Sequence, residues 1–147
     1  MVSIIKEDIE FVAEGVKILI RRSKTDQSGE GTLKAIPYFD NQEFCPVTAL
    51  KEYIKLKNWS LNEEKIFDIS DKSVALIIKK YAQIAGLDSS KYSGHSLRSG
   101  FATTAAEFGA EERSIMAMTG HKTTQMVRRY IHEGNLFKNN ALNKVKL

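Results

Sequence analysis

The spacing of apolar residues changes once along the 147-residue chain, at Cys45 and Pro46. Before this point, short runs rich in β-branched and aromatic residues predict three strands, with a turn signal at Glu14-Gly15. A polar, glycine-containing segment before the third run predicts a loop. The expected strands are 9–12, 16–20 and 32–36, and the expected loop is 24–31. We therefore expect a small three-stranded antiparallel sheet.

After Cys45 the apolar residues recur at helical spacing. Pro46 fits the first position of a helix, because the N–H that proline lacks is not needed there. The apolar face of this helix consists of Val47, Leu50, Tyr53 and Ile54. Four more helices are expected between capping residues and terminating glycines: from Ser70 or Asp71 to Gly86, from Ser93 or Ser96 to Gly109, from Glu111 to Gly120, and from about Lys122 to Gly134. The predicted fold class is α+β and mainly α-helical.

The composition, 42% hydrophobic and 27% charged, is ordinary for a globular protein, and the length suits one domain. No segment approaches the roughly 20 apolar residues that a membrane span needs, and we expect no signal peptide in the first eight residues. The single cysteine, Cys45, excludes an internal disulfide and suits a reducing compartment. We therefore expect a cytoplasmic protein without a membrane partner, a metal-ligand cluster or another cofactor.

Positive charge is concentrated near the C-terminus, although the net charge is only +4. Between His121 and Leu147 one acid, Glu133, faces six basic residues: Lys122, Arg128, Arg129, Lys138, Lys144 and Lys146. Such an end suits a polyanionic partner, and it equally suits a solvated helical tail. From Asn135 onward the apolar residues favour a short helix with one apolar stripe: Leu136, Phe137, Ala141, Leu142 and Val145.

Five residues are candidates for chemistry, although each alone has a simpler explanation. Tyr130 lies on an apolar helical stripe, where a tyrosine is most often a core residue with its hydroxyl at the rim. His95 and Arg98 lie one helical turn apart, as in many surface contacts. His121 follows a glycine at a helix start, where it can act as a cap, and Lys24 lies in a polar loop that solvates a lysine.

The order of these residues is more informative than any one of them. His95 and Arg98 occur as H-x-L-R within the string SGHSLRSG. A Gly120-His121 pair follows, and Tyr130 comes nine residues after that histidine. Together these elements resemble the tyrosine recombinases of the phage-integrase type.

Two upstream segments extend this resemblance to nearly the whole chain. The string RSKTD at 22–26 resembles the β-hairpin lysine motif of the family, with Lys24 as the lysine. The string CPVTAL at 45–50 resembles the helix that usually follows. The resemblance implies a small sheet packed on a helical bundle and a domain spanning 1–147, without the N-terminal helices and the core-binding domain of the family.

The resemblance also implies a role for each candidate. Tyr130 is the nucleophile that forms a 3′-phosphotyrosyl bond, and His95 is its base. Arg98 and His121 stabilise the charge on the phosphate oxygens, and Lys24 protonates the leaving 5′-oxygen as general acid. Because the phosphotyrosyl bond stores the energy of the broken bond, religation needs neither ATP nor metal. The implied partner is double-stranded DNA, bound by a homotetramer that exchanges C-terminal tails, with a monomer expected in the absence of DNA.

One departure leaves a second hypothesis open. The family pattern has another phosphate-binding arginine upstream of the first strand, where this sequence starts with Met1. Arg21 and Arg22 are expected in a strand beside the lysine and are poor substitutes for it. The alternative is therefore a truncated, catalytically impaired remnant of such a recombinase, which retains a role in DNA binding or assembly.

Overall fold

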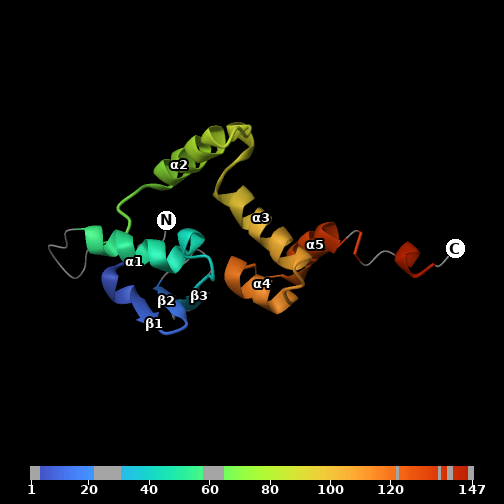
Figure 1. Cartoon of the computed structure of the whole chain (residues 1–147), viewed down its shortest axis with the longest axis horizontal. Coiled ribbons are helices and arrows are strands. Elements are labelled where there is room, and N and C mark those ends of the chain that lie inside the picture. Colours follow the sequence, from blue (N-terminus) through green and yellow to red (C-terminus); the bar gives the residue numbers. More distant parts are fainter. Residues whose placement is uncertain are drawn as a thin grey trace. The chain divides into compact units, whose positions relative to one another are not determined.

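The computed structural model describes residues 4–21, 31–57, 65–121, 123–135, 137–138 and 141–145 (Figure 1). The chain forms two compact units, Met1–Ser70 and Asp71–Leu147. Lys24 and Arg22, which the sequence places before the third strand, lie outside the described residues.

The first unit contains the expected three-stranded antiparallel sheet, in the order β1-β2-β3. Its strands are β1 (Ile9–Val12), β2 (Gly15–Ile20) and β3 (Thr32–Pro37). Gly15 begins β2 opposite both Val12 and Pro37. A Cβ atom on Gly15 would lie 2.1 Å from the carbonyl oxygen of Ile36, so only glycine lets the three strands approach this closely.

The core of the first unit lies between the sheet and helix α1 (Pro46–Leu56). Two short 3-10 helices precede these elements: η1 (Lys6–Asp8) comes before β1, and η2 (Gln42–Phe44) comes before α1. Val16, Cys45 and Val47 are buried at its centre. Around them pack half-buried residues from the strands, from α1 and from the segment after β3: Ile9, Phe11, Ile18, Ile36, Tyr38 and Leu50. As predicted, α1 begins with Pro46 at its first position.

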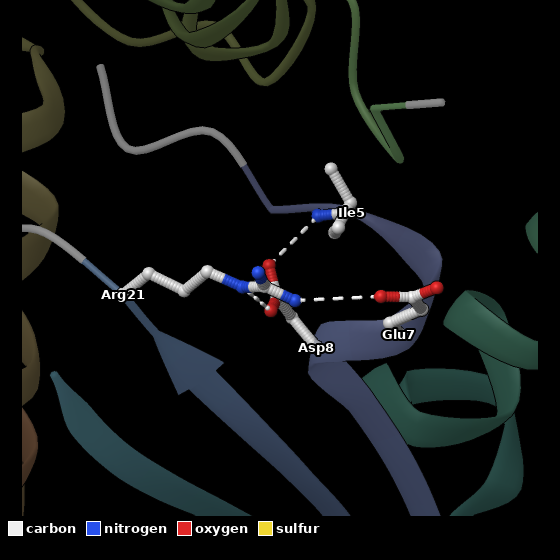
Figure 2. Close-up of polar contacts among 4 residues, drawn as sticks. All are labelled: Ile5, Glu7, Asp8 and Arg21. Atoms are coloured by element: carbon white, nitrogen blue, oxygen red, sulfur yellow. Dashed lines mark hydrogen bonds and ion pairs between the residues drawn. The ribbon is translucent and has the colours of Figure 1, made fainter. Parts of the chain in front are cut away.

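A buried carboxylate ties the end of β2 to η1 (Figure 2). Asp8 is 3% exposed and accepts a hydrogen bond of 3.0 Å from the backbone N–H of Ile5. The guanidinium of Arg21 donates to the other oxygen of Asp8 and lies 3.6 Å from Glu7. A buried carboxylate needs such partners to offset its lost hydration. Arg21 follows β2 instead of lying in a strand, which corrects the expectation from sequence.

The second unit is helical: α2 (Asp71–Ile84), η3 (Ser89–Lys91), α3 (Gly94–Glu107), α4 (Glu112–Thr119), α5 (Thr124–Asn135) and η4 (Ala141–Lys144). Three glycines adopt the left-handed conformation where the preceding helices end, as predicted: Gly86, Gly109 and Gly120, with φ of +74°, +81° and +71°. Ser93 is the N-cap of α3, its hydroxyl accepting the N–H of Ser96.

Helices α3, α4 and α5 pack together and lie side by side in Figure 1. Their shared core consists of Ala102 and Ala106 from α3, Ile115 from α4 and Val127 from α5. Because alanine side chains are small, α5 lies close against α3 along this contact. The half-buried residues around the core are Ala105, Met116, Tyr130 and Ile131.

The C-terminal part differs from the prediction in two ways. Helix α5 continues through Gly134 to Asn135, because an isolated glycine costs a helix only about 1 kcal/mol. Where a short helix with an apolar stripe was predicted, the described tail contains the 3-10 helix η4, and Phe137 and Leu142 are 86% and 74% exposed. No helix among the described residues is long and apolar enough to cross a membrane.

Candidate active site

The first turns of α3 carry three polar side chains on one side. The capping box of Ser93 and Ser96 fixes where α3 begins, and His95 then lies in the first turn. Arg98 and Ser99 are three and four residues further on, so they share a helical face with His95. His95 and Arg98 are exposed, whereas Ser99 is half-buried. This face therefore offers two exposed basic groups beside a partly covered hydroxyl.

Tyr130 meets this face from α5. Its ring is half-buried against the core shared by α3, α4 and α5. Its hydroxyl oxygen lies 3.1 Å from the hydroxyl oxygen of Ser99, and either can be the donor. The sequence therefore indicated both aspects of this residue correctly: the ring belongs to the core, and the hydroxyl lies at the rim.

His121 lies between α4 and α5, directly after the left-handed Gly120. Its ring centroid is 5.9 Å from that of Tyr130, with the ring planes tilted by 41°. Its Nδ1 atom lies 2.7 Å from the hydroxyl oxygen of Thr119, a residue that is 5% exposed. His121 and Tyr130, both singled out by the sequence, are thus neighbours.

The hydrogen bonds of Thr119 determine the tautomer of His121. A threonine hydroxyl has one proton, and that of Thr119 is donated to the carbonyl oxygen of Ile115 at 2.7 Å. Its oxygen therefore accepts from His121, so Nδ1 of the imidazole carries the proton. In neutral His121, Nε2 then has a lone pair and is an acceptor.

The environment of His121 favours this neutral form. Burial lowers the pKa of His121 below its ordinary value of 6.5, and the positive charges of Arg98 and His95 lower it further. His121 therefore gains a proton readily only when a negative charge comes near.

Four of the five predicted site residues lie in the second unit. His121 is beside Tyr130, whereas His95 and Arg98 lie on the face of α3 that also carries Ser99, the contact of the Tyr130 hydroxyl. Lys24, the fifth, lies outside the described residues. The sequence interpretation missed two residues, Ser99 and Thr119. Both could have been found, because Ser99 follows the H-x-L-R arginine and Thr119 precedes the Gly-His pair.

Part of the basic C-terminal segment is engaged within the second unit. The guanidinium Nε of Arg128 lies 3.4 Å from the carboxylate oxygens of Glu112, which links α5 to α4. The ammonium group of Lys138 donates to the carbonyl of Glu107 at the end of α3. These two basic residues therefore connect segments of the second unit, in addition to contributing positive charge to its surface.

Other tyrosines lie in different surroundings. Tyr53 stacks on Phe67 with ring centroids 5.3 Å apart, and the hydroxyl of Tyr38 accepts from Lys51. Tyr81 on α2 is 65% exposed. Tyr53 is 42% exposed, so it is less buried than the apolar face predicted for its helix implied. Tyr130 differs from them in contacting both a histidine ring and a serine hydroxyl.

Comparison with curated proteins identifies recombinases over most of the chain. The chain is 45% identical over 157 aligned residues to an integrase/recombinase xerD homolog of Selenomonas ruminantium, covering 99% of this chain and 46% of that protein. It is 30% identical over 118 residues to tyrosine recombinase XerD of Proteus mirabilis, covering 70% and 38% of the two chains. The chain thus spans less than half the length of these relatives.

A solved structure has the same fold. The crystal structure of the XerH site-specific recombinase, bound to a palindromic difH substrate in a post-cleavage complex, matches 97% of this chain and 40% of its own. The TM-score is 0.72 at 18% sequence identity. The model of the phage integrase family matches residues 1–135. With this match over most of its length, the chain belongs to the phage integrase family.

Proposed function

We propose that residues 1–147 are the catalytic domain of a site-specific recombinase that breaks and rejoins DNA through Tyr130. The observation that carries this proposal is the neighbourhood of one phenol, the Tyr130 hydroxyl, beside the imidazole of His121. Arg98, and His95 in its protonated form, lower the pKa of that same imidazole. A phenol among basic groups suits attack on a phosphodiester, because such groups favour its anionic form and bind the anionic substrate.

In the proposed step, the Tyr130 oxygen attacks the scissile phosphorus. A bond from phosphorus to the phenolic oxygen forms, and the bond from phosphorus to the 5′-oxygen breaks. The phenolic proton passes to the neutral imidazole of His95, and the 5′-oxygen takes a proton from Lys24. The 3′-phosphotyrosyl product is religated by the reverse reaction, in which a 5′-hydroxyl attacks the same phosphorus.

Arg98 and His121 are proposed to hold the non-bridging phosphate oxygens. Arg98 is exposed and presents a guanidinium, whose fork of donors matches a phosphate. Neutral His121 cannot donate from Nε2, because its one proton is on Nδ1. It therefore serves the phosphate as a cation, after taking up a proton that the approaching negative charge stabilises.

The proposed partner is double-stranded DNA, bound by a homotetramer in which each C-terminal tail packs on a neighbouring subunit. The exposed Phe137 and Leu142 of the tail support this arrangement, because they provide apolar surface for a contact. Deletion of residues 136–147 should leave a monomer in the absence of DNA and abolish higher assemblies on DNA, as measured by sedimentation. If the shortened chain assembles on DNA like the parent, the tail has no such role.

The test of the catalytic proposal is covalent capture of DNA. A pool of duplexes with randomised sequence around a nick allows the short fragment after the scissile phosphate to diffuse away, which traps the protein on the DNA. We expect an adduct on a denaturing gel with the wild-type chain and none with Tyr130→Phe. Arg98→Ala should reduce the rate of adduct formation by about 100-fold, the effect seen in other enzymes when one hydrogen-bond donor to the transition state is removed.

Because the chain spans less than half of its relatives, the assay should also include a fusion behind the N-terminal part of the Selenomonas protein. An adduct that still forms with Tyr130→Phe would show that another residue is the nucleophile. DNA binding without any adduct, in both the chain and the fusion, would contradict the catalytic proposal and favour the DNA-binding remnant.

A further inference from the structure

Ser99 lies where the two catalytic helices of the proposed site meet. On α3 it is four residues after His95 and directly after Arg98. It is also three residues before Ala102, which is buried in the helical core. Its neighbour across the contact is the Tyr130 hydroxyl on α5, at 3.1 Å.

Core packing sets the distance between Ser99 and Tyr130. Ala102 on α3 and Val127 on α5 are both fully buried in the same cluster. Ser99 precedes Ala102 by three residues and Tyr130 follows Val127 by three, so the pair lies one helical turn from this rigid contact on each helix. The serine hydroxyl is therefore held in place by tightly packed backbone instead of by a loop.

We propose that Ser99 is a positioning residue, which holds the Tyr130 hydroxyl beside Arg98 and His95 for attack on the phosphate. This inference rests on the proposed function. While the phenol is neutral, either hydroxyl can be the donor. Once the phenol gives its proton to a base, only Ser99 can donate. The hydrogen bond then has a charged acceptor and becomes stronger, so it favours the attacking form of Tyr130.

A structural role alone would give different results. In that case the hydrogen bond would only tie α3 to α5, and its loss would lower the unfolding midpoint without a specific effect on the reaction. A positioning role instead lowers the rate at saturating DNA and leaves DNA affinity unchanged. It also requires a hydroxyl at residue 99, so threonine should replace serine.

The test uses duplexes whose 3′ end carries a p-nitrophenyl phosphodiester. This leaving group departs without a proton, so the rate reports on the nucleophile and not on Lys24. The duplex pool and protein form are those that give an adduct with wild type in the capture assay. The variants are Ser99→Ala, Ser99→Thr and Tyr130→Phe, with Thr104→Ala as a matched control that removes an exposed hydroxyl from the same helix.

We expect Ser99→Ala to lower the maximal rate of p-nitrophenol release by about tenfold, the loss expected for a hydrogen bond to a charged group. The DNA concentration for half-maximal rate should not change. Ser99→Thr should restore most of the rate, and Thr104→Ala should react like wild type. Parallel urea unfolding shows how much stability each variant loses.

Three results would overturn the role of Ser99 while leaving the recombinase proposal intact. Ser99→Ala could react at the wild-type rate, it could react faster, or Ser99→Thr could be as slow as Ser99→Ala with the same loss of stability. No adduct with wild type in any form would overturn both proposals together. An adduct with wild type but not with Tyr130→Phe would support the recombinase proposal, whatever the Ser99 variants then show about positioning.

Discussion

The hydroxyl oxygen of Thr119 lies 2.7 Å from Nδ1 of His121, while its own proton is donated to the carbonyl of Ile115. One buried side chain thus links the backbone of α4 to the imidazole beside Tyr130. The link decides which nitrogen of His121 carries the proton, in the way that an outer partner orients a catalytic histidine. Nε2 remains available to the substrate.

Removal of this link should slow the proposed reaction. We expect Thr119→Val, which keeps the side-chain shape and removes the hydroxyl, to lower the rate of adduct formation by about fivefold, the value of one ordinary hydrogen bond. The measurement is the rate of DNA capture at saturating DNA. Thr119→Ser retains the oxygen and should stay near the wild-type rate. Equal rates for valine and threonine would show that the tautomer does not matter.

The charge of Arg98 should be visible in the titration of His121. Burial is the larger cause of the lowered pKa and the charge of Arg98 the next, so Arg98→Ala should raise the pKa of His121 without bringing it fully back to 6.5. The measurement is the imidazole proton shift followed by NMR as a function of pH, assigned with His121→Gln. A titration unchanged by Arg98→Ala would mean that the two groups are not neighbours in solution.

The lowered pKa of His121 also predicts how the free energy of unfolding depends on pH. Because the folded state binds the His121 proton more weakly than the unfolded chain, the unfolded state holds more protons at low pH. The contribution of neutral His121 to stability is therefore complete above about pH 6.5 and is lost as pH falls through the lowered pKa. Urea unfolding of wild type and His121→Gln should show a smaller loss between pH 7 and pH 5 in the variant. Parallel curves would contradict this assignment.

Much of the fold could be predicted from local signals. Proline at the first turn of α1 and three left-handed glycines each act within a few residues, so the sequence alone located these boundaries. For the start of α3 the sequence offered Ser93 or Ser96, and the N-cap is Ser93. Gly134 was misleading, because a glycine ends a helix only if the backbone turns left-handed there. The exposure of the tail could not be predicted either, since it depends on what the rest of the chain covers.

The site could be predicted only in part for a related reason. The spacing of the H-x-L-R, Gly-His and tyrosine elements predicted His95, Arg98, His121 and Tyr130 as one set, because it resembles the motif of the recombinase family. Ser99 could be singled out by its place after the H-x-L-R arginine, but its contact with Tyr130 joins two helices and residues 31 positions apart. No spacing rule gives such a distance. The tautomer of His121 likewise follows from one proton on Thr119, which no sequence pattern records.

The close approach at Gly15 gives a sharp test of the sheet. A Cβ atom there would be 2.1 Å from the carbonyl oxygen of Ile36, so Gly15→Ala must move backbone apart. We expect a loss of about 2–3 kcal/mol in the free energy of unfolding. Gly100→Ala is the matched control, because a Cβ atom on this helical glycine meets nothing within 4 Å. It should stabilise the protein by up to about 1 kcal/mol, and the reverse order of the two variants would refute the packing described for Gly15.

The ion pair of Arg21 and Asp8 gives a prediction that separates stability from DNA binding. Asp8 is buried and its carboxylate accepts from both Arg21 and the Ile5 backbone, so Arg21→Ala leaves a buried charge with one partner fewer. We expect a clear drop in the urea midpoint of unfolding, and we expect Asp8→Asn in the same background to recover part of it, because the residual charge is then removed. Lys17→Ala serves as the control, since its ion pair with Glu10, at 3.3 Å, has both side chains well exposed and is worth little.

Because the guanidinium of Arg21 is engaged with Asp8 and Glu7, it is not expected to bind phosphate. The double variant Arg21→Ala, Asp8→Asn should therefore bind DNA as tightly as Asp8→Asn alone, and a loss of affinity specific to Arg21 would instead place this arginine among the DNA contacts.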